Sequence, residues 1–235
     1  MKTIGLLGGM TWHSTVEYYR LINAGVQARL GASHSARCIL YSVEFEEVEQ
    51  LQGAGDWAGL EALMVDAACR LQQAGADFLL ICANTMHRTV PRLEAALSIP
   101  ILHIADATAA EIEARGLRTV GLLGTRYTME LDFYRARLES RHGLRVLVPG
   151  EADRQAVHDI IYDELGHGVI RDASRSTYKS VIRALHDQGA EGVILGCTEI
   201  PLLIRQEDYP LPLFDTTALH ASAAVSLALR DEEGL

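Results

Sequence analysis

One short stretch of this 235-residue chain occurs twice, and the second copy carries a cysteine where the first carries an alanine. Residues 71–85 align with residues 185–199, so that Cys197 corresponds to Ala83. A thiol can exchange a proton or attack as a nucleophile, whereas a methyl group can do neither. A second repeat, residues 4–8 against residues 120–124, has nearly the same offset. The two repeats predict a duplicated half and a chemically asymmetric site.

Short apolar runs alternate with amphipathic stretches, which is typical of parallel sheets built from βαβ units. The expected strands are Thr3–Leu7, Cys38–Val43, Phe78–Cys82, Ile101–Ile104, Thr119–Leu123, Arg145–Val148, Gly192–Leu195 and Pro212–Phe214. The expected helices are Thr15–Arg29, Trp57–Gln73, Ala107–Ala114, Met129–Arg141, Gln155–Leu165 and Thr177–Gln188. We therefore predict an α/β fold.

Ligands of such sheets bind at the carboxyl ends of the strands. Four turns that follow expected strands carry small or polar residues: 8–11, 83–86, 124–128 and 197–199. If the two halves face each other, all four turns converge on one crevice.

Cys197 lies between an expected strand and an expected helix start. The partial positive charge of a helix N-terminus favours a thiolate, so this position predicts a lowered pKa and suits a base or a nucleophile. A buried structural cysteine is the alternative, and the duplicated context favours the functional reading. Successive strand residues point to opposite faces, so Cys82 points away if position 83 faces the site. We interpret Cys82, Cys69 and Cys38 as structural.

Helix-start turns can hold a carboxylate or a phosphate through their backbone N–H groups. The turn at Asn84–Thr85 and the turn at Thr125–Thr128 offer such groups together with amide and hydroxyl side chains. Ordinary helix capping explains one such turn equally well. Two of them around a thiol favour substrate binding.

Composition excludes several function classes. The net charge of −10 argues against nucleic-acid binding, and no apolar run reaches the ~20 residues of a membrane span. Neither a zinc spacing nor a complete dinucleotide or Walker motif is present in the sequence. We expect a cytoplasmic protein with free thiols and no bound metal.

Four motifs together resemble the aspartate/glutamate racemase superfamily over essentially the whole chain. They are Gly8–Trp12, Cys82–His87, Leu123–Met129 and Gly196–Glu199. The resemblance implies two Rossmann-like parallel-sheet domains related by pseudo-twofold symmetry, with the site in the cleft between them. It places residues 1–98 plus 212–235 in the first domain and residues 99–211 in the second. It also implies a homodimer, no cofactor, and proton transfer at the α-carbon of an amino acid.

The resemblance also assigns the site. Cys197 and position 83 would be the two catalytic acid/bases on opposite faces of the α-carbon. The substrate-binding residues that match family positions are Asn84, Thr85, Thr125, Tyr127 and Thr128, and we expect Met10, Gln52, Thr198 and Glu199 to join them. Glu199 could orient a substrate ammonium group or hold a proton, and a solvated helix-start carboxylate is the alternative. Gln52, in an expected loop at residues 49–53, and His167 are neutral or weak partners for a distal carboxylate. The side chain of the substrate therefore stays open, and a neutral or broadly chosen amino acid fits as well as aspartate or glutamate.

Ala83 departs from the family, whose members carry Cys, or in some relatives Thr, at this position. Alanine cannot exchange a proton, so we expect racemisation to be impaired or one-sided, as in an active-site variant. Two alternatives remain open. One is a single-cysteine decarboxylase or isomerase of the same superfamily, and the other is a non-catalytic amino-acid-binding relative.

Overall fold

The computed structural model describes residues 1–230, and residues 231–235, the end of the expected first domain, lie outside the described part. Two compact units divide the chain: Met1–Ile104 with the residues from His220 onward, and Ala105–Leu219. Each unit contains one parallel sheet, and the predicted α/β class with two parallel sheets is confirmed. Within residues 1–230, no helix combines the length and apolar character needed to cross a membrane.

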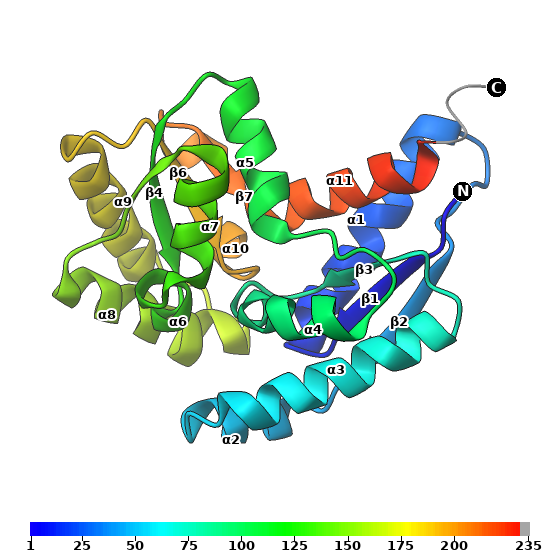
Figure 1. The fold of residues 1–235 in the computed structure, drawn as a ribbon. Coiled ribbons are helices and arrows are strands. Elements are labelled where there is room, and N and C mark those ends of the chain that lie inside the picture. The colour runs from blue at the N-terminus through cyan, green and yellow to red at the C-terminus, as the bar shows by residue number, and fades with distance from the viewer. Residues whose placement is uncertain (231–235) are drawn as a thin grey trace. The chain divides into compact units, whose positions relative to one another are not determined.

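The first unit contains a sheet with strand order β2-β1-β3, formed by Cys38–Ser42, Ile4–Gly8 and Phe78–Ile81. Ile101 adds an isolated parallel bridge to Leu79, next to β3. Helices α1 (Trp12–Leu30) and α11 (Thr216–Leu229) pack on one face of the sheet, and α3 (Trp57–Gln73) packs on the other (Figure 1). The remaining helical elements are α2 (Phe45–Gly53), a 3₁₀ turn at Thr85–Thr89 and α4 (Val90–Ala96).

The second unit contains a sheet with strand order β5-β4-β6-β7, formed by Arg145–Leu147, Thr119–Gly124, Gly192–Gly196 and Leu213–Asp215. Its helices of five residues or more are α5 (Ile104–Ala114), α6 (Arg126–Glu130), α7 (Asp132–His142), α8 (Glu151–Asp159) and α9 (Asp172–Asp187). Shorter elements are α10 (Ile200–Leu203), a π-helical turn at Ile160–Glu164, and 3₁₀ turns at Leu165–His167 and Gln206–Asp208. Because β7 pairs with β6, this unit extends past residue 211, the boundary expected from the sequence.

The duplication appears in the strand pairing. Ile4 pairs with Phe78 in the first sheet, and Val120 pairs with Gly192 in the second, which are the equivalent positions of the two repeats. The bridge at Ile101 takes the place that β7 takes in the second unit. Each unit is therefore built on the same plan, although the two share few identical residues.

Two helices, α5 and α11, each begin in one unit and continue in the other. Helix α5 begins at Ile104, the last residue of the first stretch of unit one, and continues in unit two. Helix α11 begins directly after β7 in unit two and continues in unit one, where it packs beside α1 (Figure 1). The chain thus crosses between the units twice, at 104–105 and at 219–220.

Two expectations about local structure were wrong. The stretch 101–104 is no strand beyond the bridge at Ile101, because Ile104 already begins α5. The expected loop at 49–53 is the second half of α2, which Glu44 caps by accepting hydrogen bonds from the N–H groups of Glu46 and Glu47. Glutamate is an uncommon N-cap, so this helix start carries little sequence signal.

Candidate active site

The first half-site follows β1 and β3. The backbone N–H of Cys82 donates to the carbonyl of Leu7 at 2.9 Å, so the turns after both strands begin side by side. Thr15 accepts a hydrogen bond from the N–H of Gly9 at 2.8 Å, and the hydroxyl of Ser14 donates to the carbonyl of Cys82 at 3.2 Å. Two hydroxyls from the first turn of α1 therefore hold both turns.

Ala83 and Met10 pack in the same apolar cluster, on the face of the sheet that α3 covers. Val48 of α2 belongs to this cluster, and Gln52 lies one helical turn after it, with 8 % of its surface exposed. Three predicted site residues, Met10, Gln52 and Ala83, thus come from one region of the first unit. The surroundings of position 83 are mostly apolar.

Cys82 lies on the opposite face of the sheet, fully buried in the cluster formed by α1 and α11. The alternation expected from the strand is therefore present, with Cys82 and Ala83 on opposite faces. Burial raises the pKa of Cys82 far above its usual range and raises that of Cys38 to about 11. Both thiols belong to the cluster on the face of the sheet opposite Ala83, away from the predicted site.

The second half-site follows β4 and β6. Gly124 and Gly196 are paired residues at the ends of these strands, so the turns beginning at Thr125 and Cys197 start from neighbouring positions. A Cβ on Gly124 would lie 2.9 Å from the carbonyl oxygen of Gly196. Thr125 and Thr128, both buried, lie with their hydroxyl oxygens 3.4 Å apart. The close strand ends thus place two threonines in the turn next to Cys197.

Cys197 belongs to the same side of its sheet as Leu195 and packs against the cluster beneath α9. Ala83 has the equivalent orientation in the first unit, on the side of Ile81 beneath α3. The repeats therefore agree in the direction of the side chain as well as in register. Ala83 and Cys197 are equivalent positions of two equivalent folds.

The thiol of Cys197 donates a hydrogen bond to Oε2 of Glu199 at 2.9 Å, and Thr198 Oγ1 donates to the same oxygen at 2.6 Å. Burial, followed by the negative charge of Glu199, raises the pKa of Cys197 well above its ordinary value. The expected lowering of this pKa was wrong. Helix α10 begins three residues later and has only four residues, so it supplies little dipole, and the N–H groups of Thr198 and Glu199 offset the rise only in part.

Arg126 is a cation of this half-site to which we assigned no role from the sequence. Its Nε and Nη2 lie 3.1 and 3.0 Å from Nε2 of His158, which is buried on α8. Burial and the neighbouring guanidinium lower the pKa of His158, so the ring accepts from Arg126 as a neutral base. No local signal in the sequence links residue 126 to residue 158.

The remaining polar site candidates lie as follows. Asn84 is buried in the first half-site, and Thr85 begins the 3₁₀ turn there. Tyr127 lies 6.2 Å from the His158 ring, measured between ring centroids. His167, the weak candidate for a distal carboxylate, is exposed at the end of a 3₁₀ turn. Among residues 1–230, no group of three or more His, Cys, Asp or Glu side chains is arranged to hold a metal ion.

Residues 7–224 match the family described as Asp/Glu/Hydantoin racemase. The broad specificity amino-acid racemase RacX of Bacillus subtilis (strain 168) is 26 % identical over 96 % of this chain and 98 % of its own. A crystal structure of a candidate Asp/Glu racemase from Yersinia pestis is 54 % identical, with a TM-score of 0.93 over 97 % of this chain and 100 % of that one. An aspartate racemase homologue from Pyrococcus horikoshii OT3 is 35 % identical, with a TM-score of 0.84 over 97 % and 99 % of the two chains.

The fold of two parallel sheets and the similarity to named racemases identify an α/β enzyme of the amino-acid racemase class, as predicted. The match over 7–224 then fixes the family: this chain belongs to the Asp/Glu/Hydantoin racemases. The glutamate racemase of Francisella tularensis, at 18 % identity and a TM-score of 0.68, shares the fold. The assigned roles of the individual site residues stay predictions.

Proposed function

We propose that this protein moves a proton at the α-carbon of an amino acid without pyridoxal phosphate, and that Cys197 is its acid/base. The observation that carries the proposal is the hydrogen bond from the Cys197 thiol to Glu199 at 2.9 Å, directly after β6. In this proposal Glu199 accepts the thiol proton. The resulting thiolate removes the α-proton, the thiol formed exchanges that proton with solvent, and it then returns a solvent-derived proton to the carbanion.

The raised pKa of Cys197 supports a base role once the proton has left. A thiolate whose conjugate acid is weak is a stronger base, and the α-proton of an amino acid needs one. The cationic ammonium group of a bound substrate would favour the thiolate that Glu199 now disfavours. In this proposal the buried surroundings keep the thiol protonated until substrate arrives.

The proposed role of the turns is to hold the substrate carboxylate. Backbone N–H groups, hydroxyls and an amide lie at the start of the 3₁₀ turn and at the start of α6. They belong to Asn84, Thr85, Thr125, Tyr127 and Thr128. Such donors also stabilise the negative charge that develops as the carbanion forms. Position 83 cannot act as the second acid/base, so we propose that Cys197 exchanges the proton on its own face and that water delivers a proton to the opposite face, which makes racemisation slow.

Solvent-deuterium exchange at Cα tests this function. Each enantiomer of aspartate, glutamate, methionine and homoserine is incubated with the protein in D₂O, and the label is followed by proton NMR. We expect exchange of one enantiomer to exceed exchange of the other and to vanish in the Cys197→Ser variant. Exchange that survives this substitution would show that Cys197 is not the base.

Ala83 supports decarboxylation as a second candidate function, because a decarboxylase of this fold needs only one thiol. Release of carbon dioxide from a substituted malonate, without Cα exchange of amino acids, would favour that activity. Ligand-induced thermal stabilisation with neither reaction would favour a binding protein.

We also propose that the protein is a homodimer. Trp12, Val16 and Tyr19 recur at helical spacing on α1 and are 62, 55 and 54 % exposed. An exposed apolar stripe of this kind is typical of a protein–protein contact, and a second copy of this chain is the occupant we propose.

A further inference from the structure

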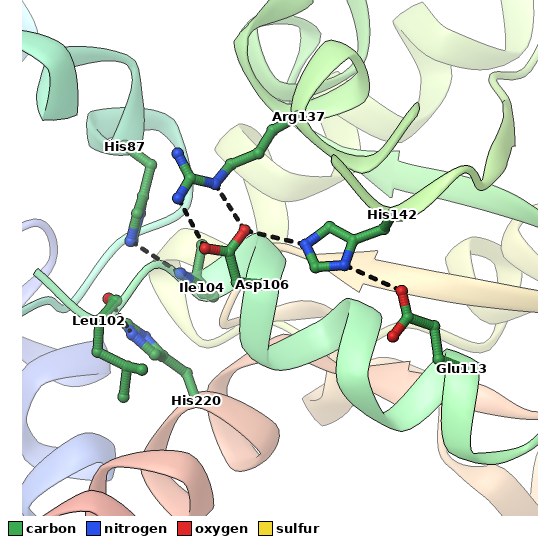
Figure 2. A network of polar contacts seen from close by, with 8 residues as sticks. All are labelled: His87, Leu102, Ile104, Asp106, Glu113, Arg137, His142 and His220. Atoms are coloured by element: carbon green, nitrogen blue, oxygen red, sulfur yellow. Dashed lines mark hydrogen bonds and ion pairs between the residues drawn. The ribbon is translucent and has the colours of Figure 1, made fainter. Parts of the chain in front are cut away.

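His87 lies beneath the first half-site and is 1 % exposed. Its Nδ1 is 2.8 Å from the carbonyl oxygen of Ala83. Its Nε2 is 3.2 Å from the backbone nitrogen of Ile104 (Figure 2). The ring also lies edge-on to His103 and His220, with centroids 4.6 and 5.6 Å away. A buried titratable side chain thus touches the backbone of the very position where the second acid/base is missing.

The partners determine the tautomer of His87. A backbone N–H can only donate, so the Nε2 that faces Ile104 must carry a lone pair. The one remaining ring proton is then on Nδ1, where it donates to Ala83. Burial, together with the neighbouring His103 and His220, lowers the pKa of His87 well below its usual value, which agrees with a neutral ring.

His87 fixes two consecutive peptide groups of the turn. Its ring donates to the carbonyl of Ala83, and its own backbone N–H donates to the carbonyl of Asn84 at 3.1 Å. In a planar trans peptide the C=O and the following N–H point in opposite directions. Holding these two carbonyls toward His87 therefore directs the N–H groups of Asn84 and Thr85 to the other side of the turn.

We propose that His87, held as its Nδ1–H tautomer, is a positioning residue that keeps the Ala83–Thr85 turn in the shape that binds the substrate carboxylate. This inference rests on the proposed function of that turn. Without the ring, either peptide can rotate and present a carbonyl oxygen, which repels a carboxylate, in place of an N–H. The bond to Ile104 anchors the ring to the start of α5, where the chain crosses into unit two.

Two substitutions separate positioning from mere filling of space. The side-chain nitrogen of asparagine reproduces the Nδ1–H donor, whereas the longer amide of glutamine reaches the place of Nε2. We expect the His87→Asn variant to bind the amino acid within about threefold of the parent, and the His87→Gln variant to bind it about tenfold more weakly. Both variants should lose thermal stability to a similar extent, because each loses one of the two ring contacts.

The measurement has two arms. Long-range ¹H–¹⁵N spectra of the histidine rings report the tautomer of His87 directly, assigned by its loss in the His87→Asn variant. Calorimetric titration with L-aspartate, L-glutamate, L-methionine and L-homoserine reports binding without turnover. An Nε2–H or doubly protonated ring, or equal weakening of binding in the two variants, would overturn the inference.

The outcomes also separate this inference from the proposed function. Cα exchange in the parent, with equal binding in both His87 variants, defeats the role of His87 and leaves the function intact. Amino-acid binding with the expected Asn/Gln difference, but without Cα exchange in the parent, supports the positioning role and defeats the racemase proposal.

Discussion

Cys197 and Glu199 form the pair on which the proposed chemistry depends. The carboxylate both accepts the hydrogen bond of the thiol and raises its pKa, so it acts on the thiol in two ways. In the protein without substrate, the thiol should be unreactive at neutral pH. Its reactivity toward an alkylating agent is therefore a measure of the pair that does not require knowledge of the substrate.

We predict that Glu199→Gln makes Cys197 alkylate severalfold faster at pH 8, because removing the negative charge of Glu199 lowers the pKa of the thiol and raises the thiolate fraction. The same substitution should slow Cα exchange, since the proton acceptor is lost. Iodoacetamide labelling followed by peptide mass spectrometry separates Cys197 from the other three cysteines. Glu207→Gln, an exposed neighbour in the same unit, is the control and should change neither rate.

A single substitution can supply an acid/base at position 83. Ala83→Cys should raise racemisation at least tenfold over the parent, since a proton can then be delivered to the other face of the α-carbon. Chiral chromatography of the product measures it. The pair Ala83→Cys and Ala83→Ser is matched in size, and equal rates for the two would contradict a thiol role at this position.

The sequence indicated which residues could carry the chemistry, but it did not indicate the direction in which the pKa of Cys197 is shifted. The opposite orientation of Cys82 and Ala83 follows from strand alternation alone, and it was predicted. The pKa of Cys197 was predicted in the wrong direction, because burial and the carboxylate two residues away outweigh a four-residue helix. The contact between Arg126 and His158 forms only when α8 packs against the turn, so no spacing in the sequence could predict it.

At the scale of elements, tight packing of the strand ends positions the half-sites. Gly9 has a φ of 97°, and a Cβ there would lie 2.3 Å from the carbonyl oxygen of Val43. The turn that carries Met10 is therefore pressed against the segment leading into α2, where only a glycine fits. The sequence predicted this turn as a binding element, but it did not reveal the neighbour.

We predict that Gly9→Ala lowers the free energy of unfolding by more than about 1 kcal/mol, since the backbone is strained and the methyl group clashes with main chain. Urea unfolding followed by circular dichroism measures this loss. Gly53→Ala is the matched control, because no atom lies within 4 Å of its added Cβ and the residue is helical. That control should leave stability unchanged or raise it slightly.

Helix α5 is joined to α7 by Asp106, which receives two hydrogen bonds of 2.6 Å from Arg137 and a third contact from His142 (Figure 2). Burial alone would raise the pKa of Asp106, but the hydrogen bonds from Arg137 and His142 outweigh it and hold the pKa below its usual value. The pKa of Asp106 is lower in the folded protein than in the unfolded chain, where it is about 3.9. The ionised carboxylate therefore stabilises the folded protein above that pH. This stabilisation is lost as the pH falls through the pKa of the folded state.

We predict that Arg137→Met destabilises the protein by about 1–3 kcal/mol at pH 7, because it leaves a half-buried carboxylate without its cation. The difference from the parent should shrink as pH falls below about 4, where Asp106 takes up a proton. Unfolding at a series of pH values measures it. Arg135→Met removes an exposed ion pair from the same helix and should cost much less at every pH. A loss that is independent of pH would contradict the assigned role of Asp106.

For the whole molecule, the repeats predicted the duplicated plan, but they did not predict the pairing of β7. Repeats in the sequence indicated two equivalent halves, and the registers of β1 with β3 and of β4 with β6 agree with them. The pairing of β7 with β6 depends on contacts between residues that are distant in sequence. The return of α11 to the first unit was expected from the family resemblance and from no local pattern. A short apolar run such as 212–214 does not show which sheet it joins.

The mass of the protein in solution tests the proposed homodimer. Sedimentation should report about twice the 25.7 kDa of one chain, and Val16→Asp should reduce it to a monomer, because a charge at the centre of the stripe resists burial. Leu202→Asp, which changes an exposed leucine in unit two, is the control. A parent protein that stays monomeric at micromolar concentration would contradict the proposal.

The exchange of final helices has a consequence for descent. A single ancestral half would consist of one such sheet and one helix that packs in the other unit, so two identical chains could complete both cores by trading that helix. Such a trade between identical chains is a domain-swapped dimer. Joining the two genes would then have made the swap permanent, and only afterwards could one copy keep a cysteine at the site while the other came to hold an alanine.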